Sequence, residues 1–264
     1  MNSVLTSLRS PHIGRVKALH TSKGRKTANE FLAEGPQAVE AAAKSKKFKV
    51  TQMYVTEAAL LQFSKLIASD PIVVSEKVMA AMSSVENSQG ILAVCIKDAL
   101  PDLNKLTATS NLLIYCHEIN DPGNLGTIIR SAHALGAQGL ILSPGSVDPF
   151  SPKVVRASAG SLWQLPFVIN IEFEDLVRSA QEVDMKSIAM TGVGKKTLND
   201  YINLLPKKSV FVFGNEAHGL PKEIITKCDE QVRIPMKAGA ESLNLATSAA
   251  LVIYAASNSQ TPIE

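Results

Sequence analysis

This sequence lacks both long apolar runs and paired cysteines. No apolar stretch approaches the roughly 20 residues that a transmembrane helix requires, so we expect no membrane partner. The three cysteines, Cys95, Cys116 and Cys228, lie far apart, form no CxxC pair and have no histidine at metal-ligand spacing. Each lies in or beside an apolar stretch. We therefore interpret them as buried thiols in a reducing compartment, and we expect no metal site.

The common nucleotide-binding and hydrolase motifs are also missing. The segment AMTGVGKKT (189–197) resembles a P-loop, but a P-loop requires a glycine in place of Ala189 and a serine or threonine in place of Lys196. A dinucleotide-binding GxGxxG that begins at Gly192 fails at Thr197. Neither GxSxG nor HExxH occurs. These absences argue against an ATPase, a Rossmann dehydrogenase, a hydrolase and a zinc protease.

Charge is unevenly distributed along the chain, whose 264 residues carry a formal net charge of +3. Residues 1–50 contain ten Lys and Arg against three acids, a net charge of +7, which leaves −4 for the other 214 residues. One basic end is typical of a protein that binds a polyanion. The alternatives are a solvated basic surface without a ligand and a transit peptide within residues 1–29.

The chain length and the pattern of elements favour two domains. In residues 1–98, short apolar strands alternate with helical stretches, which indicates a small α/β domain. Residues 99–111 are polar, contain proline and lack sustained periodicity, so we interpret them as a linker. Residues 112–264 then form the second domain.

The second domain alternates apolar strands with helices, which predicts an α/β fold with a parallel sheet covered on both faces. The predicted strands are 112–119, 139–143, 166–170, 187–190, 209–214 and 231–235. The predicted helices are 124–135, 151–162, 174–183, 221–228 and 243–257. In such sheets, ligands bind beyond the carboxyl ends of the strands.

Three of these strand ends are unusually polar. The first, HEINDPGNLGTIIRSAHALGA (117–137), begins with a turn that is typical of a helix start. The second, VFGNEAHGL (212–220), ends a buried strand with an amide, a carboxylate and an imidazole. The third, IPMKAGAESLNLATSAALVIY (234–254), leads through a Gly/Ala loop into an apolar helix.

The glycines at these strand ends predict an apolar slot lined with backbone N–H and C=O groups. Such a slot suits a flat heterocycle such as adenine. Two acids, Glu216 and Glu241, argue against a phosphate in the same place. The residues of the slot are Gly192, Gly194, Gly214, Gly239, Ile234 and Leu243.

Taken together, the three motifs resemble the signature motifs of the SpoU-type RNA ribose methyltransferases of the SPOUT superfamily. Their order and spacing match across roughly residues 110–257. The segment RVKALHTSKGRKTANEFLAEGPQAVEAA (15–42) is similar to the opening of the RNA-binding domain of the same family. The resemblance implies a deep trefoil knot that holds S-adenosylmethionine, and a homodimer built around the knotted region.

Site residues follow from the resemblance, position by position. The catalytic group that it implies is Asn124, Arg130, Glu216, Ser242 and Asn244. The cofactor site that it implies is Thr191, Gly192, Gly214, Asn215, Ile234, Met236 and Leu243. His218 matches no position with a family role. We expect Arg130, which stands among apolar residues of its helix, to be buried at an interface or site.

The implied reaction moves a methyl group from a sulfonium to a ribose 2′-hydroxyl. Arg130 would bind the adjacent phosphate and stabilise the developing alkoxide, because arginine stays protonated and is a poor base. The substrate would be RNA, with large-subunit rRNA favoured over tRNA. The alternatives are a SPOUT enzyme that methylates a base and a binding factor without activity.

Basic residues outside the motifs are the predicted RNA contacts, with solvated charge as the alternative. They are Arg15, Lys17, Arg25, Lys26, Lys153 and Arg156. The last two stand one turn apart on a helix that we expect near the active site. Trp163 and Phe167 are predicted to be core residues. We expect a cytoplasmic protein, with an organelle as the alternative.

Overall fold

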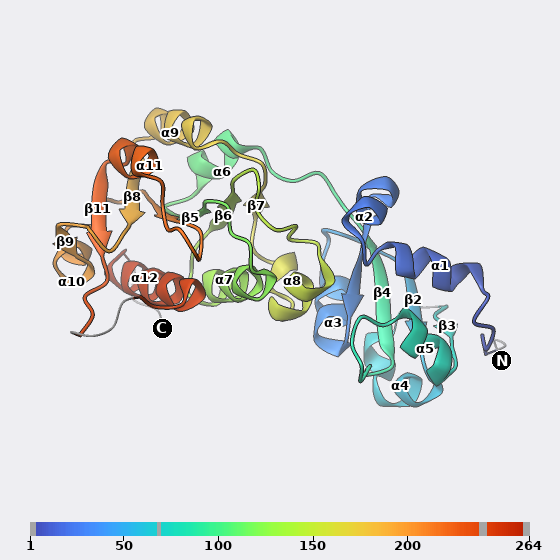
Figure 1. Ribbon diagram of the computed structural model, residues 1–264. Coiled ribbons are helices and arrows are strands. Elements are labelled where there is room, and N and C mark those ends of the chain that lie inside the picture. The colour runs from blue at the N-terminus through green and yellow to red at the C-terminus, as the bar shows by residue number, and fades with distance from the viewer. Residues whose placement is uncertain (1–3, 68–69, 238–241, 261–264) are drawn as a thin grey trace. The chain divides into compact units, whose positions relative to one another are not determined.

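Two compact units make up the chain, and the first is assembled from two separate segments. The computed structural model describes residues 4–67, 70–237 and 242–260 (Figure 1). The first unit contains residues 1–99 and 148–164, and the second contains residues 100–147 and 165–264. Residues 148–164, which the sequence analysis placed in the second domain, thus belong to the first unit.

A mixed sheet of four strands forms the centre of the first unit. Side by side, its strands are β1 (Glu30–Glu34), β4 (Ile91–Ile96), β2 (Val50–Val55) and β3 (Ile72–Val73). The pairs β1–β4 and β4–β2 are antiparallel, and the pair β2–β3 is parallel. The helices are α1 (Pro11–Ala18), α2 (Ser22–Ala28), α3 (Pro36–Lys44), α4 (Glu57–Gln62), α5 (Glu76–Met82) and α8 (Pro152–Ala157), with short 3₁₀ turns at Ser64–Leu66 and Ser161–Trp163.

Apolar side chains cover both faces of this sheet. On one face, Val16 of α1 and Val78 of α5 pack against Leu92 of β4. On the other face, the ring of Phe31 contacts Phe150, with ring centroids 4.9 Å apart, and Trp163, with centroids 5.8 Å apart. Two core residues of the first unit therefore come from the inserted segment 148–164.

A fully parallel sheet of seven strands forms the centre of the second unit, which confirms the predicted α/β class. Side by side, its strands are β7 (Phe167–Val168), β6 (Gly139–Leu142), β5 (Leu112–Cys116), β10 (Ser209–Phe213), β8 (Lys186–Met190), β11 (Glu230–Arg233) and β9 (Lys196–Thr197). Every strand pair of this sheet is parallel. The trefoil knot that the resemblance implies stays a prediction.

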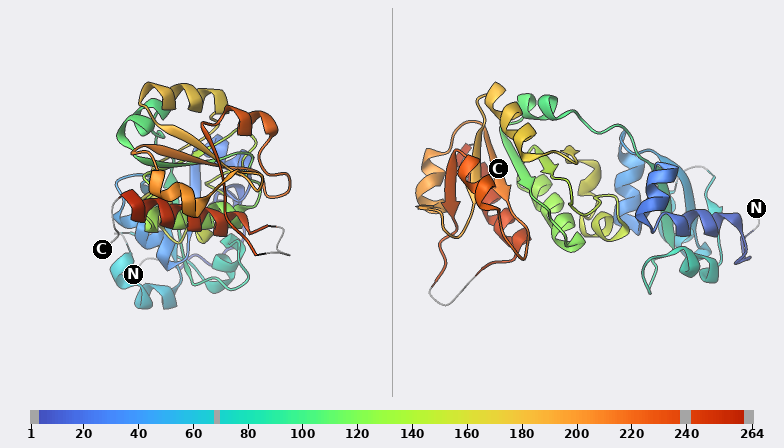
Figure 2. Two further views of the ribbon diagram at one scale, coloured as in Figure 1. Left: turned by 90° about the vertical axis from the view of Figure 1, so that its left-hand side faces the viewer. Right: turned by 45° about the horizontal axis from the view of Figure 1, so that its top comes forward.

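Helices cover both faces of the parallel sheet, as Figures 1 and 2 show. The helices are α6 (Leu103–Thr109), α7 (Pro122–Ala134), α9 (Phe173–Glu182), α10 (Leu198–Tyr201), α11 (Lys222–Lys227) and α12 (Leu245–Gln260), with a 3₁₀ turn at Ile202–Leu204. On one face of the sheet, α6, α9 and α11 pack through the buried side chains of Leu106, Leu176 and Ile224. On the other face, α7 and α12 lie side by side.

Three elements of the second unit differ from the prediction. Helix α6 lies inside the predicted linker 99–111, where Asp102 caps it by accepting hydrogen bonds from the backbone N–H groups of Asn104 and Lys105. A helix of one to two turns contains too few residues to show periodicity, so the pattern missed it. Strand β9 and helix α10 were also missed, since each is shorter than five residues.

The three thiols are buried and free, as predicted, and burial raises the pKa of Cys116 to about 12. Over the described residues, no helix is both long and apolar enough to cross a membrane. Nor do the described His, Cys, Asp and Glu side chains form a group of three or more that could hold a metal ion.

Candidate active site

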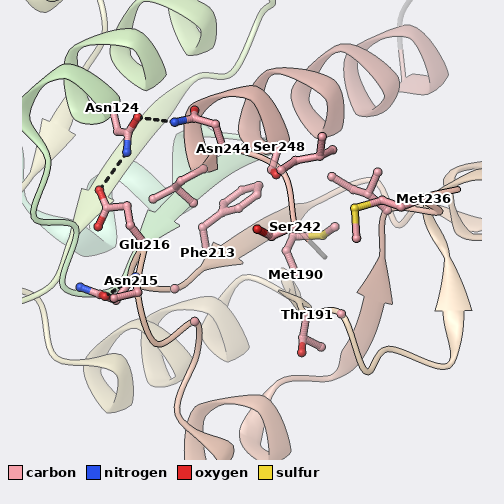
Figure 3. Close-up of a pocket in the computed structure, with 17 residues that line it drawn as sticks. Asn124, Met190, Thr191, Phe213, Asn215, Glu216, Met236, Ser242, Asn244 and Ser248 are labelled. Carbon is pink, nitrogen blue, oxygen red and sulfur yellow. Dashed lines mark hydrogen bonds between the residues drawn. The ribbon is translucent and has the colours of Figure 1, made fainter. Parts of the chain in front are cut away.

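A cavity of about 550 Å³ opens where β8, β10 and β11 end, beside the first turns of α7 and α12 (Figure 3). Its volume is typical of a site for a small molecule. Among the described residues that line it, Glu216 is the one with a charged side chain. Met190, Phe213 and Ile234 supply apolar surface at the ends of the three strands.

The turn after β10 requires a glycine at position 214. A Cβ atom on Gly214 would lie 2.2 Å from the carbonyl carbon of Gly219 and 2.3 Å from the nitrogen of Leu220, and both of these are backbone atoms. Residues Asn215 and Gly219 close the turn by two backbone hydrogen bonds, of 3.1 and 2.9 Å. This close approach leaves backbone groups, rather than a side chain, at the wall of the cavity.

Glu216 is held by the turn that precedes α7. Its carboxylate accepts hydrogen bonds from the backbone N–H groups of Asn120 at 3.1 Å and Asp121 at 3.0 Å. The side-chain amide of Asn124 donates a third, at 3.1 Å. Glu216 therefore joins the second polar strand end to the first.

These hydrogen bonds decide the charge of Glu216. Partial burial raises the pKa of the carboxyl, but the bonds from Asn120, Asn124 and Asp121 favour the ionised form more strongly, and the pKa lies below its usual value. At neutral pH this side chain is a carboxylate whose oxygens are already occupied as acceptors. It is thus better suited to fix its neighbours than to exchange a proton.

Asn244 joins the third strand end to the other two. Its Oδ1 atom accepts hydrogen bonds from the backbone N–H groups of Ala246 at 2.9 Å and Thr247 at 3.2 Å, which caps the start of α12. Its Nδ2 group donates to Oδ1 of Asn124 at 3.0 Å. Asn244, Asn124 and Glu216 thus form one hydrogen-bonded chain along the edge of the cavity (Figure 3).

Asn215 shapes the wall of the cavity from the turn after β10. Its Oδ1 atom accepts a hydrogen bond from the backbone N–H of Ala217 at 2.8 Å, and its Nδ2 group donates to the carbonyl of Glu118 at 2.8 Å. Both ends of the amide are therefore used to hold the backbone around the cavity.

The structure brings most of the predicted site residues together. All seven predicted cofactor residues line the cavity, as do four of the five predicted catalytic residues. Gly194 does not line it; a Cβ atom there would lie 2.8 Å from the backbone of Val232, so this glycine permits close packing of a loop on β11. Gly239 and Glu241 lie outside the described residues.

Sequence reasoning missed six residues that line the cavity. They are Met190, Phe213, Ala217, Gly219, Leu245 and Ser248. Two of them are the last residues of strands β8 and β10, directly before predicted site residues, and Ser248 lies one turn beyond Asn244 on α12. One further residue on each side of the predicted site residues would have added Met190, Phe213, Ala217 and Leu245.

Within one chain, Arg130 is exposed and does not line the cavity, and its burial at an interface stays a prediction. Arg130 lies six positions after Asn124 on α7, which corresponds to a rise of about 9 Å and a rotation of roughly 240° around the helix. The apolar neighbours that suggested burial, Ile128 and Ile129, face the core instead. Within one chain, Arg130 is therefore a surface residue of the layer formed by α7 and α12.

The six predicted RNA contacts all belong to the first unit, including Lys153 and Arg156, which were expected near the active site. Lys17, Lys26 and Lys153 are exposed. Arg15 forms a salt bridge with Glu30, and Arg156 donates to Glu34 at 3.2 Å.

Arg25 does not fit the prediction, because its residue is only 3% exposed. Its guanidinium donates to the carboxylate of Asp148 at 2.8 Å and to the carbonyls of Leu19 at 2.9 Å and His20 at 3.0 Å. These bonds occupy the side chain inside the first unit, where it ties α2 to residue 148. Arg25 is thus a structural residue and not an exposed RNA contact.

The site can hold a small, mainly uncharged ring system and present a reacting group beside it. The backbone of Gly214 lies at the wall without a side chain to cover it, while Phe213, Ile234 and Leu243 offer apolar contact. These features fit the nucleoside part of S-adenosylmethionine.

Comparisons with known proteins agree with this geometry. Residues 111–254 match the model of the SpoU rRNA Methylase family, and residues 10–93 match the MRM3-like substrate binding domain. A Synechocystis protein called an uncharacterized tRNA/rRNA methyltransferase is 32% identical over 262 residues, which cover 97% of this chain and 94% of that protein.

The 23S rRNA (guanosine(2553)-2′-O)-methyltransferase RlmP of Bacillus subtilis is 32% identical over 239 residues, or 90% of this chain and 92% of RlmP. Among solved structures, the AdoMet-bound rRNA methyltransferase of Sinorhizobium meliloti superposes with a TM-score of 0.83 at 29% identity, covering 96% of this chain and 97% of that one. With its three motifs gathered around one cavity and its family model spanning more than half of its length, this chain belongs to the SpoU rRNA methylase family.

Proposed function

We propose that this protein is an S-adenosylmethionine-dependent RNA methyltransferase that methylates a ribose 2′-hydroxyl, with large-subunit rRNA as the first substrate to test and tRNA as the second. The observation that carries the proposal is the convergence of three polar strand ends on one cavity. RlmP, which is similar over 90% of this chain, is named for the same reaction on 23S rRNA.

S-adenosylmethionine is the cofactor, and it supplies a methyl group that the sulfonium has already activated. The residues that would hold it are Thr191, Gly192, Gly214, Asn215, Ile234, Met236 and Leu243. The protein is then left with two tasks, which are to position the ribose and to stabilise charge on its hydroxyl oxygen.

Asn124, Glu216 and Asn244 perform the positioning. Glu216 fixes the backbone at Asn120 and Asp121, Asn244 fixes the start of α12, and Asn124 joins these two side chains, so the edge of the cavity is rigid before the RNA arrives. Ser242 lines the same cavity and presents a hydroxyl that can hydrogen-bond to the ribose. Rigid donors and acceptors at a reaction centre lower the barrier because they need no reorganisation during the reaction.

Arg130 lies outside the cavity of its own chain, so in this proposal the Arg130 of a second copy binds the RNA phosphate and stabilises the alkoxide. Its exposure on α7 makes the guanidinium accessible to a phosphate, to which it can donate two parallel hydrogen bonds. Because arginine does not release its proton at neutral pH, the proton of the 2′-hydroxyl goes to the phosphate or to water.

A homodimer is also part of the proposal. Helix α12 exposes Leu251 by 44% and Tyr254 by 57%, and residues three apart lie on one side of a helix. Both belong to the layer that carries Arg130, so a second copy seated on α12 would cover this apolar surface and enclose the outer side of α7.

The test is transfer of a labelled methyl group from S-adenosylmethionine to unmodified rRNA and tRNA pools by the wild type and by Arg130→Ala. We expect label in the rRNA pool and a loss of at least 100-fold in the variant, in the range found when one charge-stabilising donor is removed. Nuclease-resistant dinucleotides in the product would identify 2′-O-methylation, whereas a labelled free base would identify base methylation. Cofactor binding without transfer to any RNA would contradict the proposal and favour a binding factor.

A further inference from the structure

The first unit carries five lysines around one end of its sheet that no described acid neutralises by an ion pair. We call them the lysine patch, defined as Lys26, Lys46, Lys47, Lys49 and Lys97. None of them forms a salt bridge with any other residue that the structure describes, whereas the neighbouring Lys44 pairs with Glu40. The four residues Lys26, Lys46, Lys47 and Lys49 are exposed, and Lys97 is half-buried.

Backbone contacts bring the members of the patch together. The loop that contains Lys46, Lys47 and Lys49 runs beside the end of β4, because the N–H of Ile96 donates to the carbonyl of Lys49 at 3.0 Å. Lys97 directly follows the last residue of β4. Its N–H donates to the carbonyl of Asn29 at 2.9 Å, directly after α2, which brings Lys26 of α2 to the same end of the sheet.

The loop is anchored by Phe48, which lies between Lys47 and Lys49. Its ring is buried and meets the rings of Phe31 and Phe150 edge to face, with centroids 5.7 and 5.4 Å apart. Its backbone has a φ of 52°, in the left-handed region, and its N–H donates to the carboxylate of Asp98 at 2.5 Å. The two flanking lysines therefore stand on a fixed backbone.

Lys97 is fixed as well. Its ammonium nitrogen lies 4.8 Å from the centroid of the Phe150 ring. Burial lowers the pKa of Lys97, and the positive charges of Arg25 and Lys26 lower it further, while Asp148 acts in the opposite direction. A phosphate beside this ammonium would favour its charged form and offset the repulsion by the two neighbouring cations.

Acids near the patch do not cancel its charge. Asp148 is paired with the buried guanidinium of Arg25, and Asp98 accepts the N–H of Phe48. The arginines that the sequence pointed to are already engaged, since Arg15 binds Glu30 and Arg156 binds Glu34. To bind Arg15 or Arg156, a phosphate would have to displace a carboxylate. Among the described residues, the lysines of the patch have no carboxylate to displace.

We propose that the lysine patch is the surface by which the first unit binds the RNA backbone, in place of Arg15, Arg25 and Arg156. This inference rests on the proposed function for the identity of the polyanion. The aromatic rings near the patch, Phe31, Phe48 and Phe150, are buried, so no base can stack on them. The patch therefore holds phosphates and does not read bases, which makes its contribution independent of sequence and strongly dependent on salt.

The experiment measures the dissociation constant of the full-length protein for an unmodified in vitro transcript of 23S rRNA between 50 and 200 mM KCl. The variant Lys47→Gln/Lys49→Gln is compared with Lys65→Gln/Lys77→Gln, which removes the same charge from exposed residues of the same unit. We expect the slope of log affinity against log salt to become shallower by about one per patch lysine. The control should leave the slope unchanged.

Lys97 is tested separately, because its side chain also packs on Phe150. Lys97→Gln should make the slope shallower by about one, and Lys97→Arg, which keeps the charge, should restore it. Thermal unfolding of each variant shows whether the fold is intact.

Equal slopes for the patch variant and its control would overturn the inference. If the wild type methylates the transcript and the patch variants behave like the control, the inference fails while the proposed function stands. If the wild type binds the transcript through the patch but transfers no methyl group, the proposed function fails and the patch stands.

Discussion

At the scale of single residues, Gly214 shows how a backbone contact can matter more than a side chain. Gly214→Ala would push a Cβ atom into the backbone of Gly219 and Leu220. We expect a loss of about 1–3 kcal/mol in the free energy of unfolding, as for other overpacked sites, and weaker binding of S-adenosylmethionine.

Gly192→Ala is the matched control for this prediction. Both glycines line the cavity, but a Cβ atom on Gly192 would meet no atom within 4 Å. Urea unfolding measures the stability of both variants, and calorimetry measures their cofactor binding. Equal stabilities would contradict the steric argument.

The charge of Glu216 leads to a prediction about pH. The native pKa lies below the usual value of 4.5, so the ionised carboxylate stabilises the fold above about pH 4.5, and this contribution disappears as the pH falls through the native pKa. We expect the wild type to be more stable than Glu216→Gln at pH 7 and the difference to shrink below pH 4.

Urea midpoints between pH 7 and pH 3 check this expectation. Glu86→Gln is the control, because Glu86 is exposed and has no partner among the described residues. A difference between the wild type and Glu216→Gln that stays constant over this range would exclude an electrostatic role.

Residue-scale prediction from the sequence worked where a motif fell at a strand end. Asn124, Glu216 and Asn244 were predicted separately, on three segments, and the structure joins them by hydrogen bonds. Arg130 could not be placed in this way. Its apolar neighbours suggested burial, but the direction of a side chain on a helix depends on which face meets the sheet, and that is decided by tertiary packing.

At the scale of elements, Asn244 allows helix capping to be separated from the positioning of Asn124. Asn244→Ala removes the cap of α12 and should cost about 1 kcal/mol. Asn244→Asp keeps the capping oxygen but replaces the Nδ2 donor by an oxygen that faces Oδ1 of Asn124. We expect Asn244→Asp to stay close to the wild type in stability and to lose at least tenfold in methyl transfer.

Thermal unfolding and labelled methyl transfer, measured on the same preparations, distinguish these outcomes. Wild-type activity in Asn244→Asp would show that the bond between the two asparagines does not serve the reaction.

Helix α2 provides a second prediction at this scale. Arg25→Met would leave the carboxylate of Asp148 and two carbonyls without their donor, and the loss of one partner of a buried pair costs about 3 kcal/mol or more. Lys26→Met, one residue along, should leave the unfolding free energy unchanged to within about 0.5 kcal/mol, because its side chain is exposed. Urea unfolding measures both, and equal losses would contradict the structural role of Arg25.

Elements long enough to show a period were predicted, and short ones were missed. Helix α7 and strand β10 carry clear patterns, and their predicted ends lie within two residues of the observed ones. Helix α6 has only seven residues, and its buried side chains Leu106 and Thr107 are adjacent, which resembles no helical period. Its formation depends on the Asp102 cap and on packing against α9.

At the scale of the whole molecule, the proposed homodimer is tested through α12. Leu251→Asp places a charge on the exposed apolar side of this helix, and we expect it to halve the mass measured by light scattering. Leu61→Asp is the control, since Leu61 is 82% exposed on α4 of the first unit. A dimer in both variants, or a monomeric wild type, would contradict an interface on α12.

The division into units was the part of the fold least accessible from the sequence. A boundary is recognised by a change in composition, and no such change marks residues 148–164. Phe150 and Trp163 are apolar like their neighbours, and only contact with Phe31 assigns them to the first unit. Patterns along a chain do not show which apolar residue meets which.

This insertion has a consequence for the order of events during synthesis. When the ribosome has made residues 1–99, all four strands of the first sheet exist, but the rings of Phe150 and Trp163 do not. One side of Phe31 and Phe48 then stays open to water while β5, α7 and β6 are made. The nascent chain thus carries this apolar surface through more than forty further rounds of elongation, and the first unit is complete only after β5, α7 and β6 of the second unit have been made.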